Sequence, residues 1–358
     1  MGKKILAFVI PITSCYPATS EASGILFADK SISNWMYNNF IQIFQVESNN
    51  AIDYYDFAID NNPFLSYNEI DYRFIYNNWK SLCEFIIRCI NDNYYVRLFN
   101  NMEKNSLYQN KADIQHDLLI YGYDEEEQKF SVADHFNNGK FEKKLCGFNE
   151  LEYSVDTYRP ELFKTNPAFL NCVQIIKKEK DMMRLRFSMY TPDEMDYILS
   201  LNLTRIIDSL DDYINGKPTI NWYTRGRVMN EYLASSHKWG IQCYDILNIH
   251  INEYMNGIQS FSAQSFYLFY NHKLVMLERI KKIKDVYEWS DWKKHFENYK
   301  YLKELTNQLM LLQMKLQYVK EKIRLANHMK ELIRQLKEID YEYTVQLRDE
   351  LKEYVNRI

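Results

Sequence analysis

The chain has 358 residues, a net charge of −4 and an aromatic content of 16%. Because glycine and proline are scarce, this composition excludes a collagen-like or disordered chain and favours packed helices and sheets. The slightly acidic balance gives no overall attraction to nucleic acid, so no nucleic-acid partner is expected.

The cysteines fall at no metal-ligand spacing, and no CxxC pair occurs, so neither a metal nor another cofactor is expected. Without a disulfide framework, the cysteines indicate a reducing compartment, the cytoplasm. No apolar run is long enough to span a membrane. The six positions are Cys15, Cys83, Cys89, Cys146, Cys172 and Cys243.

The N-terminal segment admits two readings. The apolar run 5–12, which follows Lys3 and Lys4, resembles the core of a lipoprotein signal ending in a lipidated Cys15. The alternative is that residues 4–12 form a buried β-strand. The run is short and contains Pro11, which favours the strand. After a turn at Thr13 and Ser14, Pro17 suits the first turn of a helix.

Cys15 would then lie at a helix N-terminus. The unpaired N–H groups and the positive end of the helix dipole lower the pKa of a thiol there. The same N–H groups can receive the negative oxygen of a tetrahedral intermediate. Cys15 is therefore a candidate nucleophile, and the alternative is a small buried residue. Glu21, further along this helix, is expected on the surface.

The chain then alternates between helices and strands. We expect a helix that passes into a strand over 33–46, a helix over 74–92 and a strand over 94–100. Residues 101–115 are polar and irregular, which indicates a loop, and 140–158 carry strand and helix fragments.

Residues 113–135 carry the clearest pattern. Polar and apolar residues alternate on both sides of an acidic turn, which predicts an antiparallel hairpin. If the register is even, His116 lies opposite Asp134 or on its diagonal, about 4.5–8 Å away. A histidine oriented by a carboxylate is two thirds of a nucleophilic triad. The alternative is a solvated hairpin that carries both residues by chance.

The second half is helical. Residues 191–194 (TPDE) form a helix start signal, and that helix should run to about Asn215 and end at Gly216. Further helices are expected near 225–237, 241–255 and 262–287. From Leu302 to Ala326 the apolar residues step by three and four, which predicts a coiled-coil seam. The three-and-four spacing of apolar residues is then interrupted, and a last helix is expected near 340–356.

This seam fits either an antiparallel hairpin within one chain or a homodimer. The predicted domains are 1–160, which would be catalytic, and 161–358, which would be helical with seam helices at about 297–356. Scattered histidines in the helical part read as structural: His237, His250, His272, His295 and His328.

Three stretches carry a resemblance to a known family. Residues 115–124 (QHDLLIYGYD) and 130–134 (FSVAD) resemble the BtrH-like family of butirosin biosynthesis, a cysteine-peptidase-like group to which the closthioamide amide synthase is related. Residues 266–280 (FYLFYNHKLVMLERI) resemble its helical C-terminal half. The resemblance implies an α+β papain-like fold, with Cys at a helix N-terminus and His and Asp on an antiparallel sheet.

The resemblance also implies an activity. It is acyl transfer, in antibiotic biosynthesis, from a carrier-protein thioester through a cysteine acyl-enzyme to an amine. Carried over residue by residue, Cys15 is the nucleophile, His116 the base and Asp134 the orienting acid. Papain-like peptidases place an oxyanion-hole Gln shortly before the nucleophile, and residues 8–14 contain none. Gln42 is the candidate substitute.

Two alternatives stay open. A cysteine peptidase or thioester hydrolase would use the same triad, and a non-catalytic protein would use the C-terminal helices to bind partners. The expected partners are an acyl or peptidyl carrier protein, with its phosphopantetheine arm, and an amine acceptor. Residues 272–358 hold 19 Lys and Arg against 14 Asp and Glu, a net charge of +5. Lysines at 281–284 and 293–294 are the predicted steering surface for an acidic carrier.

Overall fold

The computed structural model describes residues 2–46, 51–55, 64–109, 112–137, 139–156, 172–178, 184–185, 188–189, 199–219, 237–258 and 263–357. The fold is mixed α+β, with an antiparallel sheet and a helical C-terminal half. The chain forms two compact units. The sheet unit comprises Met1–Lys30 and Asn62–Met189, and the helical unit comprises Ser31–Asn61 and Tyr190–Ile358.

This division differs from the boundary predicted at residue 160. Residues 172–178 form a strand that pairs with two strands of the sheet unit, so the unit extends past 160. The segment 31–61 joins the helical unit instead of the predicted catalytic domain. Pairing between segments distant in sequence sets both boundaries.

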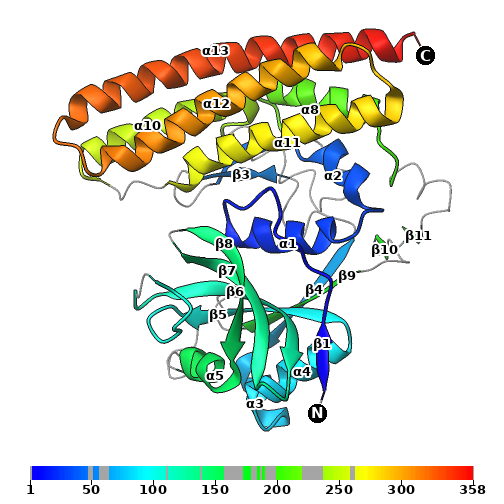
Figure 1. The fold of residues 1–358 in the computed structure, drawn as a ribbon, viewed down its shortest axis with the longest axis vertical. Helices are drawn as coiled ribbons and strands as arrows, with labels where there is room; N and C mark the ends of the chain where they lie inside the picture. Colours follow the sequence, from blue (N-terminus) through cyan, green and yellow to red (C-terminus); the bar gives the residue numbers. More distant parts are fainter. Residues whose placement is uncertain are drawn as a thin grey trace. The chain divides into compact units, whose positions relative to one another are not determined.

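The sheet unit is built on an antiparallel sheet in the order β4-β9-β5-β6-β7-β8, with β1 also paired to β6 (Figure 1). A separate short pair, β10 and β11, follows it. The strands are β1 (Lys3–Ile5), β4 (Leu65–Asp71), β5 (Tyr94–Asn101), β6 (Gln115–Asp124), β7 (Lys129–Asn137), β8 (Lys140–Gly147), β9 (Cys172–Lys178), β10 (Arg184–Leu185) and β11 (Ser188–Met189). The helices are α1 (Pro17–Phe27), α3 (Tyr72–Asn78), α4 (Leu82–Asn91) and α5 (Phe148–Asp156).

Helices α4 and α5 pack on the sheet, and their apolar side chains form its main hydrophobic core together with those of the strands. Alternate residues of the strands, such as Leu98, Leu118 and Val132, are fully buried in that core. The single helix predicted over 74–92 is wrong, because Ser81 starts a second helix. Its hydroxyl accepts a hydrogen bond from the Glu84 N–H at 3.1 Å, which satisfies a first-turn amide.

The predicted hairpin is confirmed as β6 and β7. Its register shifts between Ile120 and Gly122, where a bulge inserts one residue into β6. Leu119 pairs with Ala133, and one step further the same register sets Asp134 opposite Leu118. Asp134 is therefore on the diagonal of His116, as an even register requires.

The N-terminal segment differs from the predicted buried strand. β1 has three residues, and Ile5, Val9 and Ile10 are 57%, 37% and 47% exposed. Beyond β1 the chain leaves the ladder and crosses α1, where the Val9 N–H donates to the Gly24 carbonyl at 3.1 Å. The helix start at Pro17 is confirmed.

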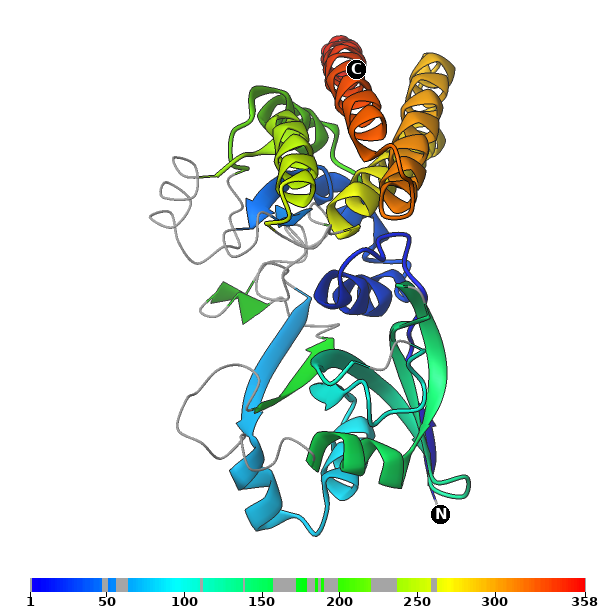
Figure 2. The same ribbon diagram turned by 90° about the vertical axis from the view of Figure 1, so that its left-hand side faces the viewer.

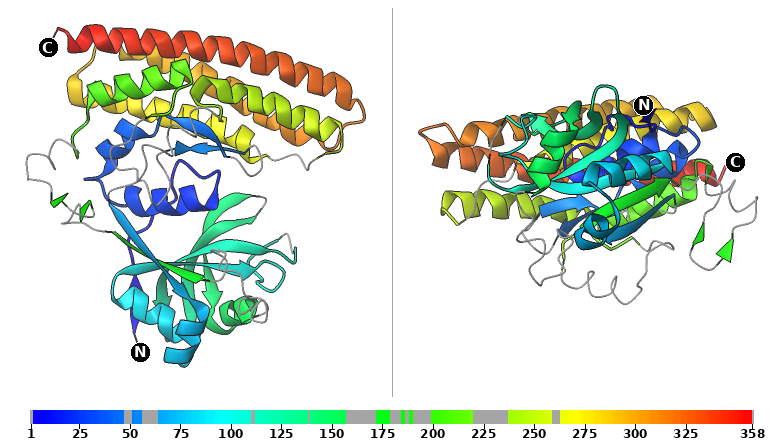
Figure 3. Two further views of the ribbon diagram at one scale, coloured as in Figure 1. Left: turned by 180° about the vertical axis from the view of Figure 1, so that it is seen from behind. Right: turned by 90° about the horizontal axis from the view of Figure 1, so that it is seen from below.

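The helical unit contains three long antiparallel helices, α11, α12 and α13, that lie side by side (Figure 3). One carboxylate joins four of its helices. Asp340 of α13 accepts from Lys273 of α11 at 2.5 Å, Tyr213 of α8 at 2.7 Å and Tyr244 of α10 at 3.0 Å. The elements are α2 (Ser33–Asn39), β2 (Ile43–Val46), β3 (Ala51–Tyr54), α8 (Leu203–Asn215), the 3₁₀ turn η4 (Gly240–Cys243), α10 (Tyr244–Met255), α11 (Gln264–Tyr287), α12 (Trp292–Leu316) and α13 (Lys322–Val355).

Several helix predictions change. α8 begins only at Leu203, capped by Asn202, so one helix from 191 to 215 is wrong; residues 191–198 and most of the predicted helix near 225–237 lie outside the described residues. The separate last helix predicted near 340–356 is also wrong, because α13 runs without interruption through this region. The seam predicted from Leu302 to Ala326 is interrupted, because α12 ends at Leu316 and α13 begins at Lys322. α12 and α13 pack against each other within one chain, as in the intrachain-hairpin alternative. Among the helices described, none has the length and apolarity needed to cross a bilayer.

Gly24→Ala tests the crossing of α1. Alanine normally stabilises a helix interior by about 1 kcal/mol relative to glycine. Here a methyl group would overlap the Phe8 ring and approach the Val9 carbonyl oxygen to 2.7 Å. We expect the free energy of unfolding in urea to fall by about 1–3 kcal/mol. Gly147→Ala is the matched control, because its nearest neighbour would be 3.8 Å away. A stabilised Gly24→Ala protein would contradict the crossing.

Candidate active site

The centre of the site is a buried carboxylate paired with a histidine. Asp134 of β7 is fully buried, and its Oδ2 lies 2.8 Å from Nδ1 of His116, whose side chain is 26% exposed. Nδ1 also lies 3.2 Å from the Asp117 carbonyl oxygen, so both hydrogen bonds described for the ring use the same nitrogen. This arrangement orients Nε2 as the nitrogen for proton transfer.

His116 and Asp134 each shift the pKa of the other toward its charged form. Burial acts to lower the pKa of His116, but the hydrogen bond and charge of Asp134 outweigh it and raise that pKa to about 9. Burial acts to raise the pKa of Asp134, but the hydrogen bonds from His116 and its neighbours outweigh it and lower that pKa. At neutral pH the site therefore holds an imidazolium beside a carboxylate.

A tyrosine that the sequence did not single out completes the carboxylate's environment. The Tyr108 hydroxyl donates to Asp134 Oδ2 at 2.5 Å and accepts from Asn100 Nδ2 at 3.1 Å. Asn105 donates in turn to Asn100. Tyr108 comes from the loop predicted over 101–115, and no period or motif marks it, because its role depends on a contact 26 residues away.

Cys15 is 3% exposed and lies directly before Tyr16, the N-cap residue of α1. α1 packs against β6 and β7, the two strands that carry His116 and Asp134 (Figure 2). The carbonyl oxygen of Ser14, the residue before Cys15, accepts from Nε2 of His135 at 2.8 Å. Hydrogen bonds therefore connect the residue before Cys15 to His116 in three steps: Ser14 bonds to His135, the His135 backbone bonds to Asp134, and Asp134 bonds to His116.

The surface position expected for Glu21 is wrong. Glu21 is fully buried, and its Oε2 lies 2.9 Å from Nε of Arg97 on β5. Arg97 also pairs with Asp117 at 2.9 Å and donates to Gln174 of β9 at 3.0 Å. Burial raises the pKa of Glu21 well above its usual value, and Arg97 offsets this only in part. Sequence spacing gave no signal of this partner, because β5 lies far along the chain.

Gln42, the candidate oxyanion donor, belongs to the helical unit. Its Nε2 donates to the Lys217 carbonyl at 2.6 Å, and its Oε1 accepts from the Ile43 N–H at 3.2 Å. Both ends of its amide therefore bind the backbone of its own unit.

Three other cysteines of the sheet unit lie in its main core. Cys83 and Cys89 are buried in the main core, as predicted. Burial raises the pKa of Cys89 to about 12, and burial also raises the pKa of Cys83. Cys146, also in this core, has its pKa raised to about 12 by burial. A thiol in such surroundings stays protonated and unreactive at neutral pH.

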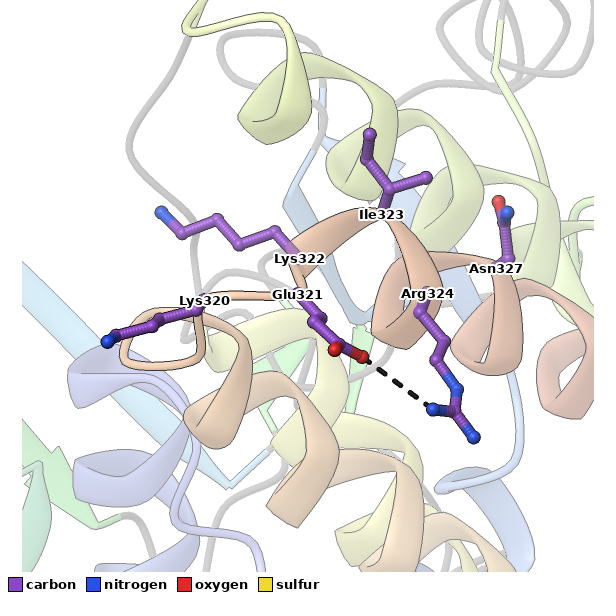
Figure 4. A pocket seen from close by; sticks show the side chains of 6 residues that line it. All are labelled: Lys320, Glu321, Lys322, Ile323, Arg324 and Asn327. Carbon is purple, nitrogen blue, oxygen red and sulfur yellow. Dashed lines mark ion pairs between the residues drawn. The ribbon is translucent and has the colours of Figure 1, made fainter.

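A surface hollow of about 740 Å³ lies elsewhere, at the turn between α12 and α13 (Figure 4). Arg324 and Glu321 face each other across 3.6 Å there. Its lining offers no nucleophile and no oriented base, so the hollow is not the candidate active site. In the described residues, no three His, Cys, Asp or Glu side chains are grouped to hold a metal ion. The lining residues are Lys320, Glu321, Lys322, Ile323, Arg324 and Asn327.

Neither the family models nor the curated proteins compared with this chain give a match. The case for the site therefore depends on its geometry and electrostatics.

The pair makes stability depend on pH in a defined direction. Because the pKa of His116 rises from 6.5 to about 9 on folding, its contribution is fully present below pH 6.5 and is lost as the pH rises through 9. We expect the difference in the free energy of unfolding between the wild type and His116→Gln to shrink over this window. His328→Gln, at an exposed position on α13, is the control. A difference that does not change with pH would refute the pairing.

Proposed function

We propose that the protein is a cysteine-dependent acyltransferase that forms an amide from a carrier-protein thioester and an amine. The observation that carries the proposal is the buried Asp134–His116 pair, in the same unit as Cys15. The sheet, with a cysteine just before the start of a helix packed on the strands that bear His and Asp, fits the papain-like arrangement that the sequence resemblance implies. We place the protein in the cytoplasm, where thiols stay reduced.

In the first half-reaction the Cys15 thiolate attacks the carbonyl carbon of the acyl thioester. A tetrahedral intermediate forms, and its C–S bond to the carrier breaks. The imidazolium of His116 gives its proton to the departing carrier thiolate, which leaves as a thiol. Asp134 keeps the imidazole in the tautomer that presents Nε2.

In the second half-reaction the amine attacks the Cys15 acyl-enzyme. The neutral His116 takes a proton from the amine nitrogen, the amide forms, and Cys15 leaves as a thiolate. The imidazolium and thiolate of the resting site are restored. No ATP is consumed, because both thioesters are already activated. Water in place of the amine would give a hydrolase with the same residues.

The helix terminus supports the same role. Tyr16 gives no side-chain hydrogen bond to the first turn of α1, and Pro17 opens the helix. Backbone N–H groups at a helix N-terminus are suited in general to a developing oxyanion.

The carrier would approach with a long phosphopantetheine arm, since Cys15 is buried.

Part of the predicted steering surface is already neutralised by neighbouring carboxylates. Lys281 pairs with Glu278 at 2.8 Å, and Lys284 pairs with Asp285 at 3.0 Å. Lys294 pairs with Glu350 at 2.7 Å. These lysines are therefore a weaker docking surface for an acidic carrier than their number in the sequence indicates.

Cys15→Ala is expected to abolish the covalent acyl adduct that mass spectrometry detects after incubation with a small acyl thioester. Cys83→Ala should leave the adduct unchanged, because burial keeps that thiol protonated. In the wild type, an amine should release the adduct faster than water does. An adduct that persists in Cys15→Ala would remove the proposed nucleophile, and release by water alone would favour the hydrolase.

Asp134→Asn is expected to lower the rate of acyl transfer by roughly 10²–10⁴-fold, because an amide neither stabilises the imidazolium nor fixes its tautomer. Circular dichroism should show that the fold is kept. Asp92→Asn, which breaks an exposed pair with Arg88, serves as the control and should leave the rate unchanged. Equal rates in the two variants would mean that Asp134 only stabilises the hairpin.

A further inference from the structure

A second histidine lies between the cysteine turn and the central carboxylate. His135 follows Asp134 on β7, and its ring is 10% exposed. Because the Ser14 carbonyl oxygen can only accept, Nε2 of His135 is the donor in their 2.8 Å hydrogen bond. An edge-to-face contact with Phe141, with ring centroids 5.0 Å apart, fixes the plane of the imidazole.

The other side of His135 faces Asp134. Its backbone N–H donates to Asp134 Oδ1 at 2.6 Å, and its Nδ1 lies 3.6 Å from the same oxygen. The two oxygens of Asp134 therefore have different partners: Oδ2 bonds to His116 and Oδ1 bonds to His135. One buried carboxylate thus connects the proposed base to the residue that holds the cysteine turn.

The remainder of α1 has separate anchors. Glu21 is paired with Arg97 at 2.9 Å. Thr13, on the other side of the turn, donates through Oγ1 to Ser23 Oγ at 2.9 Å. The contact with His135 is therefore one anchor among several, and its loss should loosen the Ser14–Cys15 peptide without releasing the helix.

We propose that His135 is a positioning residue that holds the Cys15 turn in register with the Asp134–His116 pair. Its Nε2–H fixes the carbonyl that precedes the nucleophile, and its backbone N–H is anchored to the carboxylate that orients the base. The catalytic consequence rests on the proposed function, but the structural role does not. A displacement of about 1 Å between reacting groups costs roughly 10²-fold in rate, so such an anchor matters to chemistry.

Two substitutions separate the hydrogen bond from the bulk of the ring. His135→Phe keeps an aromatic ring and removes the donor, whereas His135→Gln places an amide N–H near the position of Nε2. Backbone hydrogen exchange at residues 14–16 and the rate of Cys15 alkylation by iodoacetamide are measured without any acyl donor. We expect both to change in His135→Phe and to return close to the wild-type values in His135→Gln. His328→Phe, at an exposed position, is the control and should behave as the wild type.

The kinetic measurement uses a small acyl thioester and an amine. We expect kcat to fall by about 10–10²-fold in His135→Phe with KM little changed, and His135→Gln to recover most of the loss. Wild-type exchange and alkylation in His135→Phe, or equal defects in both variants, would overturn the positioning role. If the wild type forms no adduct, the proposed function fails, while exchange at residues 14–16 still decides the role of His135.

Discussion

Tyr121 is the extra residue of the bulge between β6 and β7, and the register of the site depends on it. Without the bulge, the pairing of Gly122 with Ser131 would continue and set Asp134 opposite Leu119, on the face away from His116. The N-terminal segment supports the bulge, because the Leu6 N–H donates to the Tyr121 carbonyl at 2.8 Å. A contact between residues far apart in sequence thus supports the one-residue shift in the register of the hairpin.

The same constraint explains why Asp134 can be buried and charged. An isolated carboxylate in a protein interior is costly unless hydrogen bonds and opposite charge compensate it. Tyr108, His116 and the backbone of His135 supply that compensation from three directions. The donors restrain the carboxylate, the carboxylate raises the pKa of His116, and the imidazolium in turn stabilises the carboxylate. Removing the carboxylate would leave the Tyr108 hydroxyl and the His135 backbone N–H without the acceptor that they share.

Local signals in the sequence predicted local structure well. Alternation identified the β6–β7 hairpin, and the proline at position 17 marked the start of α1. The single helix predicted over 74–92 failed on a local signal, the Ser81 cap, whereas two other predictions failed where a distant contact outweighed the local pattern. The residues after β1 cross α1 instead of extending the strand, and α13 runs on through the interruption in the apolar spacing, where Asp340 bonds to three other helices.

For the site, the sequence pattern predicted which reactive groups are present: a cysteine before a helix, and a histidine and an aspartate on one hairpin. It also limited their separation, because strand geometry sets the distance between diagonal neighbours. The even register follows only from the folded chain, as do the positions of Tyr108, His135 and the Arg97–Glu21 pair around the site. These contacts join segments with no shared period, and one inserted residue reverses which face a side chain occupies, so no local pattern encodes them.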